Sequence, residues 1–267
     1  MERELIVVRG GGDIATGIIQ ALHRAGLRVL VLEAACPMAI RRTVALCEAV
    51  RLGAMVVEDV TARLVSSEND IHACFAAGEV PMAVDPEGEW IQRLRPAGVV
   101  DAILAKRNLG TALSMAPAVI GIGPGFCAGE DAHAVIETMR GHDLGRMILA
   151  GRALANTGIP GELGGKSAER VIHAPCDGVL RYEHQIGDVV PAGETVLYVD
   201  DVPCAAPFTG LLRGLIAKGV PIHRGMKIAD IDPRTDVDWH TISDKARCIG
   251  GAVLTAYLFL RSKGERG

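Results

Sequence analysis

The first part of the chain alternates between two hydrophobic patterns. Residues 5–8 are four consecutive apolar residues, which is typical of a short buried strand. Between residues 13 and 25, apolar residues recur at intervals of three and four, which is the period of a helix. A second apolar run at residues 29–32 ends on the acidic Glu33. The pattern therefore predicts a strand, a turn, a helix and a second strand.

The turn between this first strand and the helix consists of Gly10, Gly11 and Gly12. This layout is typical of a Rossmann-like dinucleotide-binding domain, in which the first glycine makes a tight turn and the second lets a pyrophosphate approach the backbone. Free N–H groups in the first turn of the helix would bind the phosphates. Glu33 follows the turn at about the 20-residue distance expected of a carboxylate that binds a ribose hydroxyl. Ala15 replaces the third glycine, a variant that the pattern accepts.

Asp13 leaves a second interpretation of this turn open. It stands at the start of the predicted helix, where its carboxylate would cap the free N–H groups and repel a phosphate. The turn then either binds a nucleotide or closes an α/β domain in which Asp13 occupies the anion position.

Short apolar runs continue to alternate with helical stretches as far as residue 104, and Ser67 to Asp70 is a typical helix start. This alternation predicts an α/β fold with a mainly parallel sheet and helices on both faces. Ligands bind outside the carboxyl ends of the strands in such sheets. Polar residues that follow predicted strands are therefore candidates for binding a ligand; they are Arg41, Arg42, Asp101, Lys106 and Asn108.

A second glycine-rich turn follows the predicted strand at residues 118–122 and contains Gly123 and Gly125. We expect a helix over residues 132–140, which would place His133 and Glu137 on one face. Two glycine-rich turns at one sheet edge would form two backbone cradles, and this favours a nucleotide-like ligand.

The second half contains an internal repeat. Residues 174–181 recur as residues 206–213, and the offset persists without a gap from Gly187 and Gly219 to Val196 and Ile228. The repeat predicts a small pseudo-twofold β-barrel or sandwich. Its pattern resembles the biotinyl/lipoyl barrel-sandwich family, in which a hairpin lysine carries the prosthetic group. The corresponding residues 198–203 contain no lysine, so we expect no covalent biotin or lipoyl group.

We expect three segments in all. Residues 1–166 form the Rossmann-like nucleotide-binding domain, and residues 167–234 form the β-rich domain. Residues 235–267 contain a helix that Ser243 can cap and that is expected to pack on the first domain.

Composition limits the function classes. Aromatic residues make up 3 % of the 267 residues and the formal net charge is −4, so we expect no nucleic-acid partner. No apolar run is long enough to cross a bilayer, and the seven scattered cysteines are typical of a cytoplasmic protein without a metal motif. A homodimer is compatible with such a fold.

Several longer motifs occur together in this chain. They are residues 9–17, 37–42, 101–110, 123–126, 135–142, 228–234 and 242–246. Together they resemble the YqeB family of accessory proteins for selenium-dependent molybdenum hydroxylases. The resemblance implies a role in the maturation of a molybdenum hydroxylase of the xanthine dehydrogenase type, which would be the client partner. It supplies no catalytic residue by position.

The resulting hypothesis is an accessory protein that binds a nucleotide or the dinucleotide form of the molybdenum cofactor. Arg41, Arg42, Lys106 or Asn108 would neutralise its phosphates. The first alternative is an NAD-dependent oxidoreductase, supported by Gly10, Gly12 and Glu33 but lacking an acid–base constellation. The second is a non-catalytic scaffold in which Asp13 keeps nucleotides out.

Overall fold

The computed structural model describes residues 4–158 and 161–264. The chain forms two compact units. Unit 1 comprises Met1–Pro37, Ala45–Thr157 and Ile242–Gly267, and unit 2 comprises Met38–Val44 and Gly158–Thr241. This division differs from the three continuous segments expected from the sequence, because a short piece of the N-terminal half belongs to unit 2.

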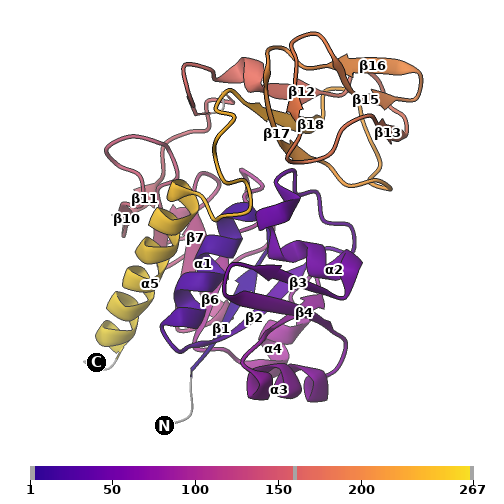
Figure 1. The fold of residues 1–267 in the computed structure, drawn as a ribbon. Helices are drawn as coiled ribbons and strands as arrows, with labels where there is room; N and C mark the ends of the chain where they lie inside the picture. Colours follow the sequence, from indigo (N-terminus) through magenta and orange to yellow (C-terminus); the bar gives the residue numbers. More distant parts are fainter. Residues whose placement is uncertain (1–3, 159–160, 265–267) are drawn as a thin grey trace. The chain divides into compact units, whose positions relative to one another are not determined.

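Unit 1 contains a large mainly parallel sheet, as predicted (Figure 1). The strands run in the order β10-β9-β7-β6-β1-β2-β5-β4-β3, and β3 and β10 at the two edges are antiparallel to their neighbours. The bounds are β1 (Leu5–Arg9), β2 (Arg28–Glu33), β3 (Ala54–Val57), β4 (Val60–Val65), β5 (Val80–Val84), β6 (Gly98–Asp101), β7 (Ala118–Ile122), β9 (Ala134–Ile136) and β10 (Met147–Ile148). A separate pair joins β8 (Cys127–Ala128) to β11 (Gly151–Arg152).

Helices cover this sheet because successive strand residues point to opposite faces and both sets are apolar. One set packs in a core with residues of α3 (Glu68–Ala77) and α4 (Glu89–Leu94). On the other side, α1 (Asp13–Arg24) lies along α5 (Asp244–Gly264), as Figure 1 shows. A short α2 (Ala49–Leu52) follows two 3₁₀ turns, Arg42–Val44 and Leu46–Glu48. Ser67 caps α3 in a capping box with Asp70, as its sequence indicated.

The expected helix over residues 132–140 is wrong. Residues Ala134–Ile136 form β9, which pairs in parallel with β7. Val135 and Ile136 are β-branched and fully buried, so this segment satisfies the preferences of a buried strand. His133 and Glu137 therefore share no helix face, and the second glycine-rich turn does not lead into a helix.

The described residues of unit 2 are all β apart from the 3₁₀ turns Arg42–Val44 and Ala168–Arg170. One sheet has the order β12-β18-β17-β14 and the other β13-β15-β16. The bounds are β12 (Val171–His173), β13 (Leu180–Tyr182), β14 (Val189–Val190), β15 (Thr195–Val199), β16 (Val202–Ala205), β17 (Gly210–Leu215) and β18 (Lys227–Asp232). Side chains from both sheets form a common apolar core.

The internal repeat builds equivalent pairings. The repeat relates β12 to β16, β13 to β17 and β15 to β18. The β15–β16 pairing therefore corresponds to the β18–β12 pairing, and the β13–β15 pairing corresponds to the β17–β18 pairing. The pairing of Val190 with Gly210 has its counterpart in the bridge between Ile222 and Gly178. Ile222 lies 32 positions after Val190, and Gly178 lies 32 positions before Gly210. Each copy thus exchanges strands with the other.

Met38–Val44 belongs to unit 2, to which a backbone hydrogen bond and an apolar contact connect it. The Leu215 N–H donates to the carbonyl oxygen of Ile40 at 2.8 Å, and the Ile40 side chain packs at the β-rich core. Among the described residues, no helix has the combination of length and hydrophobicity needed to cross a membrane.

Candidate functional site

The candidate site of unit 1 lies at the carboxyl ends of β1 and β6. From β1 the chain proceeds to β2 on one side, and it returns later as β6 on the other side. Ligands of open α/β sheets bind at such a change of direction. Gly10, Gly11 and Gly12 follow β1 here, and a loop that includes Lys106 and Asn108 follows β6.

Gly10 and Gly11 make contacts within the protein. Gly10 has φ +94°, and a Cβ there would lie 3.0 Å from the carbonyl oxygen of Ala102. The Gly11 N–H donates to Glu33 Oε2 at 2.8 Å, and the Gly11 carbonyl oxygen accepts from the Cys47 N–H at 2.8 Å. These two glycines are therefore needed for close approach of the chain to itself.

Glu33 closes the glycine turn from the end of β2. Its other carboxylate oxygen accepts from the Ala34 N–H at 2.8 Å. Burial raises the pKa of Glu33, and the two backbone N–H groups act in the opposite direction. The structure thus places Glu33 beside the turn as predicted and shows that it binds the turn's own backbone.

Gly12 is different from its two neighbours. It is the N-cap residue of α1, no side chain caps the helix there, and a Cβ at Gly12 would meet nothing within 4 Å. Asp13 and Ala15 lie in the first turn of α1, where Ala15 is buried and Asp13 is partly exposed. The open face of this helix start is where an anion can approach backbone N–H groups.

Lys245 adds a cation to this edge, which the sequence did not indicate. It lies in the first turn of α5 and is partly buried. Burial lowers the pKa of Lys245 and Arg140 lowers it further, while Asp13, Glu137 and Asp244 act in the opposite direction. Lys245 and Asp13 are therefore close enough to interact electrostatically, although they lie on different helices.

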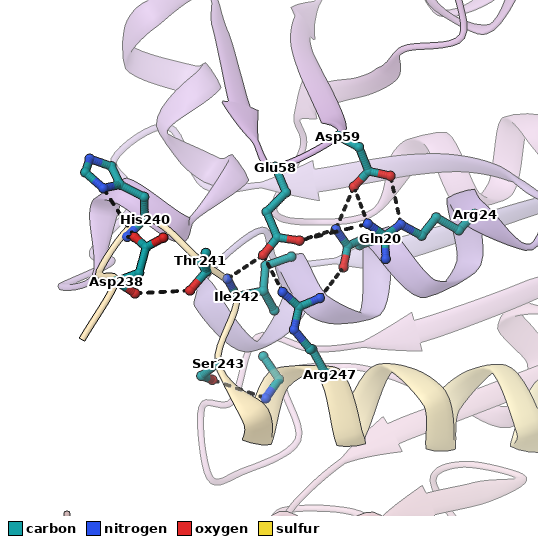
Figure 2. Close-up of polar contacts among 11 residues, drawn as sticks. Gln20, Arg24, Glu58, Asp59, Asp238, His240, Thr241, Ile242, Ser243 and Arg247 are labelled. Atoms are coloured by element: carbon teal, nitrogen blue, oxygen red, sulfur yellow. Dashed lines mark hydrogen bonds and ion pairs between the residues drawn. The ribbon is translucent and has the colours of Figure 1, made fainter. Parts of the chain in front are cut away.

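The start of α5 is fixed by a network of polar contacts (Figure 2). Glu58, in the turn between β3 and β4, accepts hydrogen bonds from the Ile242 N–H at 2.8 Å and from Arg247 at 2.5 Å. Gln20 of α1 donates to Glu58 at 2.9 Å and to Asp59 at 2.7 Å. Ser243 caps the helix by accepting from the Ala246 N–H at 3.2 Å. This network holds the segment that carries Lys245.

Asp101 and Asn108 form hydrogen bonds with other residues of the chain. Asp101 is 1 % exposed and accepts from Arg9 at 3.3 Å and from the Thr111 hydroxyl at 2.6 Å. Asn108 donates to the Thr111 carbonyl oxygen at 2.8 Å and to Asp131 at 3.1 Å. These bonds shape the loop after β6. Arg9 was missed, although a charged residue within a buried apolar strand is itself an indication of such a pair.

The loop after β6 also meets the second glycine turn. A Cβ at Gly125, where φ is +118°, would lie 2.8 Å from the Arg107 backbone nitrogen, and Lys106 is exposed on the same loop. A Cβ at Gly123 would lie 2.7 Å from the Thr138 hydroxyl. The two glycine turns thus flank one loop, and the second packs against protein atoms.

Arg41 and Arg42 lie in unit 2. Arg42 Nε donates to the Leu215 carbonyl oxygen at 2.7 Å, and Arg41 is largely buried. The sequence grouped them with the glycine turns because they follow β2 closely. In the described part of the chain, no group of three or more His, Cys, Asp or Glu side chains is arranged to hold a metal ion.

Comparison with curated sequences shows a close relative. The chain is 47 % identical over 264 residues to a protein of Escherichia coli (strain K12) that carries the name uncharacterized protein YqeB. The match covers 98 % of this chain and 49 % of YqeB, so the chain spans about half the length of this relative. No protein-family model matches.

Two solved structures of the ectoine utilization protein EutE (DoeB) from Ruegeria pomeroyi, product-bound and apo, were also found. They are 10 % and 9 % identical to this chain with TM-scores of 0.26 and 0.25, and the matches cover 86 % of this chain and 85 % and 86 % of theirs. These scores are too low to support an argument about fold. Sequence identity places the chain in the YqeB family, where it corresponds to about half of the E. coli protein.

Proposed function

We propose that this chain binds a phosphate-bearing small molecule, a nucleotide or the dinucleotide form of the molybdenum cofactor, at the start of α1 in unit 1. In this role it would be an accessory protein in the maturation of a selenium-dependent molybdenum hydroxylase. The client enzyme and the handling of selenium belong to this proposal through the resemblance of the sequence motifs.

One observation carries the proposal. The N-terminus of α1 is open at Gly12, which supplies no capping side chain, and lies at the change of strand direction between β1 and β6. Backbone N–H groups at such a helix start bind phosphate oxygens. Lys245 places an ammonium group within electrostatic range of the same turn. A phosphate-bearing cofactor fits this combination of a helix start that is open at Gly12 and a nearby cation.

The finer fold assignments belong to the same proposal. The β1–α1–β2 order, with Glu33 at the end of β2, supports a Rossmann-like class for unit 1. The exchanged strands of the repeat support a barrel-sandwich class for unit 2. At the hairpin between β15 and β16, Asp200 and Asp201 stand where a carrier domain has its lysine, so we assign unit 2 no carrier role.

Two variants test the site. Gly12→Leu places a side chain in the open space, and the extended backbone at Gly12 (φ −67°, ψ −174°) accepts it without strain. Lys245→Gln removes the ammonium group. Gly251→Leu is the matched control, because Gly251 is exposed and a Cβ there also meets nothing within 4 Å.

The measurement is isothermal titration calorimetry with ADP, NAD⁺ and molybdenum cofactor released from a purified molybdenum hydroxylase. We expect at least one of them to bind the parent chain, and Gly12→Leu and Lys245→Gln to weaken that binding by roughly tenfold or more. Gly251→Leu should bind like the parent. Binding that is unchanged in both site variants, or no binding of any probe, would exclude the proposed site.

The same titration separates the alternatives. Binding of NAD⁺ with turnover of NADH against candidate substrates would favour an oxidoreductase. Nucleotide binding that appears only after Asp13→Ser would favour the scaffold in which Asp13 occupies the anion position.

A further inference from the structure

Unit 2 buries an unusual number of charges beside one pair of strands. Asp230 and Asp232 on β18 are 3 % and 0 % exposed. Arg170, the last residue of the 3₁₀ turn before β12, is 5 % exposed. Arg213 on β17 has a side chain that is 12 % exposed. A buried charge is costly unless it is paired and fully hydrogen-bonded, so each of these groups requires a partner.

Asp232 has its partners. It accepts from Arg213 at 3.1 Å and from Arg234 Nε and a terminal Arg234 nitrogen at 2.9 and 2.8 Å. Burial raises the pKa of Asp232, but the hydrogen bonds from Arg234 and the charge of Arg213 outweigh it and hold the pKa below its usual value. The ionised carboxylate therefore positions two guanidinium groups side by side.

Arg170 and Asp230 are not satisfied in the same way. The nearest Arg170 nitrogen lies 3.6 Å from Asp230 Oδ1, and Lys227 Nζ lies 3.6 Å from the same oxygen, so neither contact is a hydrogen bond. Two nitrogens of Arg170, Nε and Nη1, donate to no acceptor within the described residues. A guanidinium that is more than nine-tenths buried thus keeps two unused donors.

The cluster has an excess of positive charge. Among the described residues of this cluster, four cations form ion pairs with the two carboxylates Asp230 and Asp232; they are Arg170, Arg213, Lys227 and Arg234. Burial lowers the pKa of Arg213, and the nearby charge of Arg41 lowers it further. An anionic group of about two charges would balance this excess.

The internal repeat shows that the fold does not require these charges. Residues 32 positions earlier form the equivalent hairpin of the first copy, and Tyr198 and Val202 stand there in place of Asp230 and Arg234. Arg181, the counterpart of Arg213, is 60 % exposed at its side chain and pairs with Glu183. The first copy builds its strands without a buried cationic cluster, so the cluster of the second copy serves another purpose.

We propose that Arg170, Arg213 and the neighbouring cations of unit 2 bind a phosphate or diphosphate group of a small molecule. Guanidinium forks bind phosphate oxygens through paired hydrogen bonds, and a phosphate carries more charge than a carboxylate to balance the excess. Residues of unit 2 alone form this site, and the proposal does not depend on the function proposed for unit 1.

Calorimetry with pyrophosphate on the full chain tests this site. The double variant Gly12→Leu, Lys245→Gln serves as the background, so that binding at the start of α1 is weakened twice over, and each substitution in unit 2 is compared with this background. We expect pyrophosphate to bind, and Arg170→Gln and Arg213→Gln each to weaken binding by roughly tenfold or more. Arg181→Gln, the matched substitution in the first copy, should leave affinity unchanged.

Asp230→Asn supplies a readout that a purely structural cluster would not give. It removes a negative charge near the ligand, so pyrophosphate affinity should rise several-fold. If Arg170→Gln does not fold, Arg170→Lys keeps the charge without the fork and should still weaken binding. No binding of pyrophosphate at millimolar concentration, or equal binding by the background, Arg213→Gln and Asp230→Asn, would overturn the proposal.

Discussion

Gly10 and Gly12 are two positions apart and have opposite surroundings. Gly10 combines a left-handed backbone conformation with the Ala102 carbonyl oxygen at its Cβ position, whereas Gly12 faces open space in an extended conformation. The same residue type thus serves the fold at one position and leaves a surface open at the other.

Alanine substitutions separate these two roles. We expect Gly10→Ala to lower the free energy of unfolding by about 1–3 kcal/mol, because alanine is strained at φ +94° and its Cβ approaches backbone atoms. Gly12→Ala should change it by less than about 0.5 kcal/mol. Urea denaturation measures both, and equal losses in the two variants would contradict the account of this turn.

Sequence alone identified part of the site at the level of residues. The glycine turn and Glu33 were predicted to lie at the same edge of the sheet because the strand–turn–helix–strand pattern places them at the ends of two neighbouring strands, and Gly11 and Glu33 are hydrogen-bonded. The hydrogen bond from the Gly11 N–H to Glu33 was not predictable, because a sequence pattern does not show whether a polar group binds a ligand or another part of the protein. Lys245 was missed because only the packing of α5 brings it near Asp13, from the other end of the chain.

At the scale of elements, the packing of α1 on α5 depends on two glycines. A Cβ at Gly17 would collide with the Ala246 carbonyl group, and a Cβ at Gly250 would collide with the Gly17 carbonyl group. The two helix backbones therefore approach more closely than larger residues permit, and this contact positions the start of α5.

Adjacent residues of α5 provide a matched test of that contact. Gly250→Ala should destabilise unit 1 by about 1–3 kcal/mol, because the helices must separate. Gly251→Ala should stabilise it by about 0.5–1 kcal/mol, because its position is open and alanine favours a helix. Thermal unfolding of the two variants should therefore shift in opposite directions, and a shift in the same direction would argue against close packing at Gly250.

Glu58 gives the start of α5 a dependence on pH. Burial raises the pKa of Glu58, but hydrogen bonds from Gln20, the Ile242 N–H and Arg247 outweigh it, so the pKa in the folded state lies below the usual 4.5. A lowered pKa contributes stability above the unfolded-state pKa, and this contribution is lost as pH falls through the folded-state value.

We expect Glu58→Gln to lose about 1 kcal/mol of unfolding free energy at pH 7, a modest value because Arg247 is 44 % exposed at its side chain. The difference between variant and parent should shrink as pH falls below about 4.5. Denaturation at pH 7 and at pH 3 measures it. A difference that stays constant over this range would show that the charge of Glu58 is not what holds α5.

Elements with a clear spacing of apolar residues were predicted well, and very short strands were not. The β1–α1–β2 start and the capped α3 follow directly from their apolar spacing and capping residues. The segment around β9 was assigned to a helix because a three-residue strand is too short to show alternation. Its pairing with β7, a contact distant along the chain, determines its structure.

At the scale of the whole molecule, the repeat predicted a separate β-rich segment, and the strand pairings of unit 2 follow the offset of that repeat. The membership of Met38–Val44 in unit 2 was not predictable, because it depends on hydrogen bonds to Leu215 far along the chain. This membership affects the residues that were expected to bind the ligand. Arg41 lies among the charges of unit 2, so the cations expected at one site are distributed between two units.

If the open start of α1 in unit 1 binds a phosphate-bearing cofactor, as we propose, that molecule should copurify with the chain. The most direct measurement is mass spectrometry of small molecules released by denaturing the parent chain and Gly12→Leu, each purified from cells that make the molybdenum cofactor. We expect the parent to release a nucleotide or dinucleotide in near-stoichiometric amount and Gly12→Leu to release much less of it. A parent chain that releases no such molecule, and binds none when the same cell extract is added back, would contradict the proposal.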